Sequence, residues 1–84
     1  MSLEDRSGRI DRTRPEHLWA QVAADIRGDI ESGRLRPADR LPNEIELATM
    51  YGVARLTVRR AIADLVQAGH LVVVRGRGTY VRAE

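Results

Sequence analysis

The feature that most constrains the fold of this 84-residue chain is a short interval between two helical patterns. The first pattern ends at Gly52 and the second begins after Ala54, so only three residues separate them. Gly52 can take the positive φ that so tight a turn needs, and Ala48 is small enough for the two helices to cross closely beside it. The spacing therefore predicts a helix-turn-helix unit. The inner stripes are Leu47, Ala48 and Tyr51 in the first helix and Val58, Ala61, Ile62 and Leu65 in the second.

A longer helix precedes this unit. Its apolar residues recur at every fourth position, at Leu18, Val22, Ile26 and Ile30. Pro15 suits a first helical turn and Gly33 supplies a left-handed stop, so we expect this helix over residues 15–32. The following segment GRLRPADRLP contains two prolines and is expected to be extended, with one short strand. Asn43 and Glu46 then have the spacing of a capping box, which predicts that the next helix starts there.

The last part of the chain has the pattern of a β-hairpin. After Gly69, LVVVR is rich in β-branched residues, GRG offers a turn and TYVR continues as extended chain. The predicted fold class is α+β, a winged helix-turn-helix with three helices and a C-terminal β-hairpin wing. There is no Phe and a single Trp, so Leu, Ile, Val and Ala must build the core, which Trp19 is expected to cover.

The remaining composition excludes several classes of protein. The first dozen residues are highly charged and have no apolar period, so residues 1–13 are expected to be a flexible, solvated arm and residues 14–84 the folded domain. The chain has no Cys and its two His are far apart, so we expect no disulfide, metal or other cofactor. No apolar run reaches the ~20 residues that span a bilayer, and the N-terminus is not signal-like, which predicts a cytoplasmic protein without membrane contact. No nucleophile, base and orienting partner can be combined, so an enzyme is not expected.

Positive charge is concentrated in the second half of the chain. Residues 1–51 carry eight Arg against ten Asp and Glu, whereas residues 52–83 carry six Arg against the single Asp64. If the apolar stripe of the last helix faces inward, its outer side, which has no acidic neighbour in sequence, carries Arg55, Thr57, Arg59 and Arg60. The hairpin turn adds Arg75 and Arg77. Because Arg and Thr bind phosphates and base edges, this surface predicts binding of double-stranded DNA, with the helix in the major groove and the wing at the minor groove.

These motifs, in this order, resemble the DNA-binding domain of the GntR family of bacterial transcription regulators over residues 22–82. The matching segments are IESGRLRP, LPNEIELA, YGVARLTVRRAI, LVQAGHL and RGRGTYV. The resemblance implies that Arg55, Thr57 and Arg59 contact the operator and that Gly78 approaches the minor groove. It also implies a repressor that binds an inverted-repeat operator as a homodimer, with an effector-sensing domain that this chain does not contain.

Three positions depart from the family pattern at the start of the two helices. Asn43, which precedes Glu44, replaces the usual Ser and conserves a cap. Ile45 stands where the family often has a DNA-contacting Arg, so a base contact from it is doubtful. Ala54 replaces a common Ser, which removes a cap of ~1 kcal/mol and leaves main-chain amides as the phosphate contact there. The expected DNA-binding residues are Asn43, Glu44, Ala54, Arg55, Thr57, Arg59, Arg60, Arg75, Arg77 and Gly78.

Two alternative functions remain open for the same fold. A winged helix can serve as a protein-interaction module, which would require an apolar outer face on the last helix, and this face is rich in Arg instead. A non-specific nucleic-acid-binding protein would use the same basic surface, and it would bind with little sequence preference.

Overall fold

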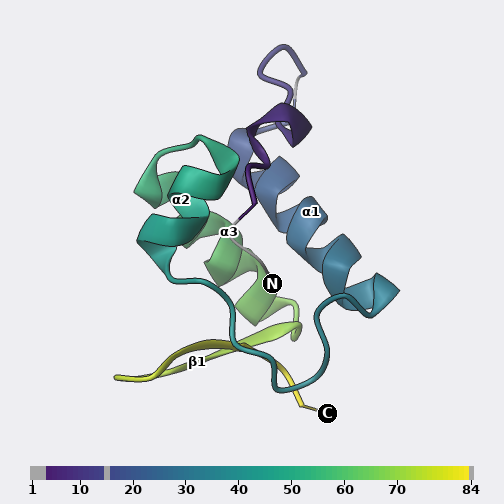
Figure 1. The fold of residues 1–84 in the computed structure, drawn as a ribbon, viewed down its shortest axis with the longest axis vertical. Coiled ribbons are helices and arrows are strands. Elements are labelled where there is room, and N and C mark those ends of the chain that lie inside the picture. The colour runs from purple at the N-terminus through teal and green to yellow at the C-terminus, as the bar shows by residue number, and fades with distance from the viewer. Residues whose placement is uncertain (1–3, 15, 84) are drawn as a thin grey trace.

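The computed structural model describes residues 4–14 and 16–83, and within them it has three α-helices followed by an antiparallel hairpin (Figure 1). This is the predicted order of elements. None of the helices in these residues is long and apolar enough to cross a membrane. The elements are a 3-10 helix η1 (Ser7–Arg9), helices α1 (Leu18–Ser32), α2 (Glu44–Tyr51) and α3 (Arg55–Gln67), and strands β1 (Leu71–Val74) and β2 (Gly78–Val81).

Helix α3 is the central element of the core. It packs against α1, α2 and β1 (Figure 1). The two helices before it and the hairpin after it therefore bury apolar side chains against the same helix. The stripes predicted from periodicity face inward, and the burial of such side chains is the main stabilising contribution in a domain of this size. The largest fully buried side chains are Tyr51, Ile26, Leu35, Leu47, Leu65, Leu71, Val22 and Val58.

The predicted cap at the start of α2 and the predicted turn between α2 and α3 are both confirmed. The Glu46 amide donates to Asn43 Oδ1 at 2.8 Å and the Asn43 amide donates to Glu46 Oε1 at 2.9 Å, which completes the capping box. Gly52 ends α2 with φ of 65° and ψ of 40°, in the left-handed region that favours glycine. The three residues between the helices therefore aim α3 across α2, as a helix-turn-helix requires.

Helix α1 begins later than predicted. It starts at Leu18 instead of residue 15, because His17 has an extended ψ of 149° and serves as its N-cap. The side chain of Gln21 donates to the carbonyls of Asp11 and Glu16 and holds these residues outside the helix. Pro15, which the sequence placed in the first turn, lies outside the described residues. The predicted stop is confirmed, since Gly33 has φ of 87°.

The segment between α1 and α2 lies along the outer edge of the hairpin. Arg40 forms an isolated antiparallel bridge with Tyr80, and the Leu41 amide donates to the Thr79 carbonyl at 2.9 Å. The short strand expected in this segment is therefore a single bridge. It fixes the chain that leads into α2 against the wing, by which we mean β1, its turn at residues 75–77, and β2 (Figure 1).

The first described segment differs from the expected solvated arm. Residues 4–9 lie between α1 and α2 (Figure 1), and the Arg6 side chain is only 2% exposed. The Arg6 amide donates to the Met50 carbonyl at 2.6 Å, and Ile10 joins the hydrophobic core. The segment packs because its Arg finds carboxylate partners on α1, a pairing that apolar periodicity does not reveal.

Candidate nucleic-acid interface

The start of α3 presents two exposed arginines on the outer side of the helix-turn-helix. Arg55 and Arg59 occupy the first two turns, and their side chains are 59% and 61% exposed. Ala54 is the N-cap and makes no side-chain hydrogen bond to the helix. The first amides of α3 therefore lie beside two guanidinium groups, a combination that attracts a phosphate or a base edge.

A single carboxylate holds both arginines. Glu44, the first residue of α2, accepts from Arg55 Nε at 3.0 Å, from Arg59 Nε at 2.9 Å and from Arg59 Nη2 at 3.0 Å. The hydrogen bond from Arg59 is the chief reason that the pKa of Glu44 lies below its usual value, and the same contact raises the pKa of Arg59. The shared carboxylate orients both guanidinium groups before any ligand arrives.

This pairing was missed from the sequence, which gave the arginines no acidic neighbour. Glu44 precedes Arg55 by 11 residues and Arg59 by 15, and only the crossing of α2 over α3 brings them together. Asn43, beside Glu44, is exposed, but its side-chain oxygen already accepts the capping hydrogen bond from Glu46. A signal for the pair existed in the motif itself, because the first turn of one helix faces the first turn of the next in such a unit.

The other two residues predicted on α3 are placed differently. Thr57 is half-buried on the helix, near Arg55 and Arg59 in sequence. Arg60 lies over the ring of Trp19, with its guanidinium carbon 4.7 Å from the ring centre. This cation–π contact directs Arg60 toward α1 and away from the pair held by Glu44. Trp19 packs against the core, as predicted, and its buried Nε1 has no hydrogen-bond partner among the described residues.

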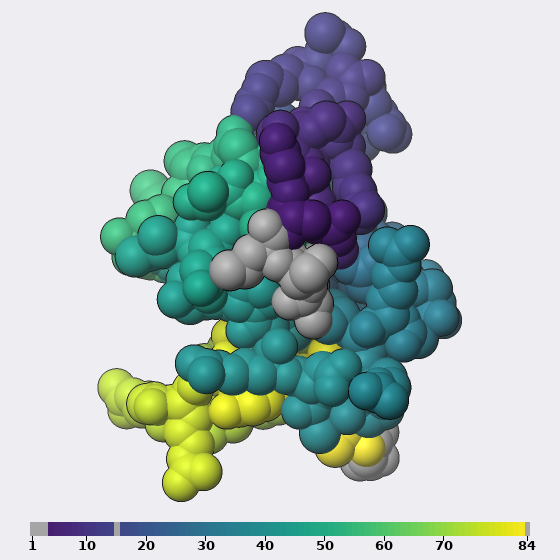
Figure 2. Space-filling model, viewed as in Figure 1, coloured from purple at the N-terminus to yellow at the C-terminus, as the bar shows by residue number. Residues whose placement is uncertain are grey.

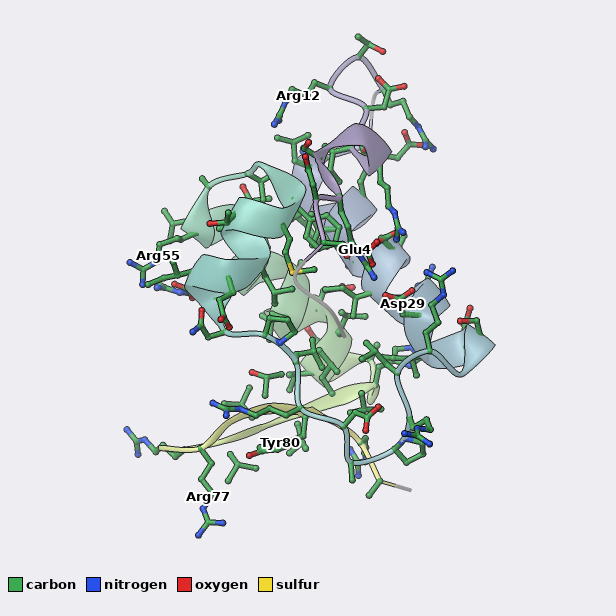
Figure 3. The ribbon with its side chains drawn as sticks, viewed as in Figure 1. Glu4, Arg12, Asp29, Arg55, Arg77 and Tyr80 are labelled. Atoms are coloured by element: carbon green, nitrogen blue, oxygen red, sulfur yellow. The ribbon has the colours of Figure 1, made fainter. Side chains whose placement is uncertain are left out.

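The wing carries the remaining predicted residues. Arg75 and Arg77 are exposed in the turn between β1 and β2, and no carboxylate in the described part of the chain pairs with either one. Figure 2 shows the hairpin projecting from the body of the molecule. In Figure 3 the labelled Arg55 and Arg77 both lie on the left side of the view. Helix α3 and the wing thus each carry exposed arginines. Residues 4–14 and 16–83 hold no cluster of His, Asp and Glu fit for a metal ion.

Gly78 begins β2 with φ of 135°, a backbone conformation that residues other than glycine rarely adopt. It directly follows Arg77, so its bare backbone lies close to the tip of the wing. The approach of Gly78 to the minor groove stays a prediction. Because Gly78 has no side chain, the guanidinium of Arg40 lies against its backbone.

Comparison with known proteins gives one consistent result. The family model for bacterial regulatory proteins of the gntR family matches residues 18–81. The uncharacterized HTH-type transcriptional regulator YurK of Bacillus subtilis is 46% identical over 66 residues, which cover 79% of this chain and 27% of YurK. The mannosyl-D-glycerate transport/metabolism system repressor MngR of Escherichia coli is 46% identical over 67 residues, or 80% of this chain and 28% of MngR. The chain thus spans less than a third of the length of these relatives.

Solved structures agree with the sequence relatives. AraR(DBD) in complex with operator ORE1 matches with a TM-score of 0.73 and 44% identity, over 75% of this chain and 77% of that one. YtrA from Sulfolobus acidocaldarius, a GntR-family transcription factor, matches with a TM-score of 0.83 and 40% identity, over 89% of this chain and 64% of that one. The fold is therefore the winged helix-turn-helix found in such DNA-binding domains.

Proposed function

Because this chain belongs to the gntR family of bacterial regulatory proteins, we propose that it recognises a specific operator in duplex DNA and thereby represses transcription. The observation that carries this proposal is the oriented pair Arg55 and Arg59 at the exposed start of α3. A helix-turn-helix inserts this end of its second helix into the major groove. The same side of the molecule presents Arg77 of the wing, which suits an adjacent minor groove (Figure 3).

The residues divide into base-reading and phosphate-binding groups in the proposed complex. Arg55 and Arg59 read base edges, because a guanidinium can donate two hydrogen bonds to guanine. Glu44 orients them, and it can also accept from a cytosine amino group when DNA replaces one of its arginine contacts. The main-chain amides after Ala54 and a second group of side chains bind phosphates, which positions the domain on the duplex without reading its sequence. This second group comprises Asn43, Thr57, Arg60, Arg75 and Arg77, with Gly78 allowing close approach of the wing backbone.

We further propose that the protein acts in the cytoplasm as a homodimer on an inverted repeat. One recognition helix reads only a few base pairs, so a single domain gives limited specificity. Two domains related by a two-fold axis would read two half-sites about one helical turn or a multiple of it apart. The match covers only 27% of YurK and 28% of MngR, so the proposed dimer contacts need not come from this chain.

The experiment that tests this function is selection of bound duplexes from a randomised DNA pool, followed by sequencing. Enrichment of a short inverted repeat is the expected result. Enrichment of a single half-site would retain specific recognition and overturn the dimer. Binding without enrichment would favour a non-specific nucleic-acid-binding protein, and no binding at low salt would favour a protein-interaction module.

Replacing Arg59 with Ala is expected to weaken binding of the selected operator by roughly 1–3 kcal/mol, because a two-bond contact to a base is lost. The measurement is the Kd on operator and on mixed-sequence duplex by fluorescence anisotropy. Arg27→Ala is the matched control, since Arg27 is an exposed arginine on α1 that pairs only weakly with Glu31 at 4.0 Å. An operator Kd that Arg59→Ala leaves unchanged would remove Arg59 from the interface.

A further inference from the structure

Arg40 is an exposed arginine in the connection between α1 and α2, and it lies beside the wing. It precedes Asn43 by three residues, and its backbone is bridged to Tyr80 of β2. The Val81 amide donates to the Asp39 carbonyl at 2.8 Å and the Leu41 amide donates to the Thr79 carbonyl at 2.9 Å, so both flanks of Arg40 are tied to the wing. The position of its backbone is therefore set by the hairpin, although the residue belongs to the connection before α2.

The side chain of Arg40 rests against Gly78. A Cβ atom built on Gly78 would lie 2.8 Å from Arg40 Nε, 3.4 Å from Nη2 and 3.5 Å from Cζ. Any side chain at position 78 would thus displace the guanidinium. Glycine at this position serves two purposes, because it accommodates φ of 135° and leaves the space in which the Arg40 guanidinium lies.

The guanidinium of Arg40 also lacks an internal counter-charge. Among residues 4–14 and 16–83, no carboxylate oxygen lies within the 4.0 Å of an ion pair with it, whereas Arg55 and Arg59 share Glu44. An arginine that is held in place but not neutralised is suited to bind an anion from outside. Its neighbours are the start of α2 on one side and the wing on the other.

We propose that Arg40 binds a backbone phosphate on the DNA strand that separates the groove entered by α3 from the groove reached by the wing. This inference rests on the proposed DNA-binding mode. If α3 occupies a major groove and the wing an adjacent minor groove, one sugar-phosphate backbone must pass between them. Arg40 lies between the wing and the start of α2, whose Glu44 holds the arginines of α3, and its guanidinium can offer a planar, bidentate donor to that backbone. Phosphate contact fixes the register of the domain and carries no base preference.

The test is the salt dependence of binding to a mixed-sequence duplex. Each neutralised phosphate contributes about 0.9 to the slope of log K against log salt concentration. Arg40→Ala is expected to reduce that slope by about 0.9 and to weaken binding by similar factors on the mixed-sequence duplex and on the selected operator. Arg40→Lys, which retains the charge, should keep the wild-type slope. Arg27→Ala controls for the loss of one exposed positive charge on α1.

The outcomes separate this inference from the proposed function. Wild-type binding together with an unchanged slope in Arg40→Ala would overturn the phosphate contact and leave DNA binding intact. A loss confined to the selected operator would also overturn it, because it would make Arg40 a reader of bases. Absence of wild-type binding would instead refute the proposed function. The melting temperature of each variant shows whether a loss of binding comes from a folding defect. Arg40→Lys is the comparison variant that keeps the charge at this position.

Discussion

Arg6→Ala is expected to lower the free energy of unfolding by about 3–5 kcal/mol, because it leaves the buried Asp29 carboxylate without its counter-charge. Arg6 Nη1 lies 2.8 Å from Asp25 Oδ2 and 2.7 Å from Asp29 Oδ2, and it donates to the Tyr51 hydroxyl at 3.0 Å. Asp29 is the most sensitive partner, since its side chain is only 8% exposed. Truncating Arg6 would thus leave a buried charge on α1 that water cannot reach well.

The Tyr51 hydroxyl extends the same network into the helix-turn-helix. It donates to Asp25 Oδ2 at 2.6 Å while it accepts from Arg6. Burial raises the pKa of the Tyr51 hydroxyl, and the hydrogen bond to Asp25 raises it further, so the group stays a neutral donor. Because Tyr51 is the last residue of α2, the network joins residues 4–6, α1 and α2 (Figure 3). Arg6→Ala should therefore loosen the packing that supports the turn before α3.

Chemical and thermal unfolding of Arg6→Ala and Arg9→Ala measure this effect. Arg9 is a matched control, because it lies in the same segment and pairs with the same Asp25 at 3.1 Å but is 36% exposed. An exposed pair of this kind contributes about 0–1 kcal/mol, so Arg9→Ala should change little. For a domain of this size, each 1 kcal/mol shifts the melting temperature by roughly 4–8 °C. Equally small losses in both variants would mean that residues 1–13 act as the solvated arm expected from the sequence.

The parts of the fold that sequence predicted well depend on local chemistry. The stripes of α2 and α3, the Asn43 cap and the Gly52 turn each follow from residues within about two helical turns of each other. The wing follows from a run of β-branched residues and a glycine-rich turn. These rules act over short distances in sequence, so a single chain contains all the information that they require.

The parts that sequence missed depend on charged residues far apart in the chain. Arg6 meets Asp25 and Asp29 across 19 and 23 residues, and Glu44 meets Arg59 across 15. Periodicity locates apolar faces and says nothing about which charge will meet which after the helices cross. The candidate site was therefore predicted as a set of arginines, whereas the carboxylate that orients two of them required the packed structure.

Gly52→Val is expected to cost about 2–5 kcal/mol of folding free energy, the sum of two effects. A left-handed conformation costs roughly 1–2 kcal/mol for a residue with a Cβ, and a β-branched residue tolerates it poorly. Gly52 has φ of 65°, and a Cβ built there would lie 3.1 Å from Ser7 Cβ, so overpacking against η1 adds about 1–3 kcal/mol. Arg12 also donates to the Gly52 carbonyl, which leaves the turn little freedom to move away.

Gly33→Val separates these two effects in an unfolding experiment. Gly33 also has positive φ, at 87°, but a Cβ there would meet nothing within 4 Å. Gly33→Val should therefore lose only the conformational part of the folding free energy. The difference in free-energy loss between Gly52→Val and Gly33→Val then measures the contact with η1. Equal losses would show that residues 4–14 do not support the turn, and an unchanged melting temperature for Gly52→Val would refute the turn geometry. Because the turn aims α3, operator binding of Gly52→Val should fall even at temperatures where the variant remains folded.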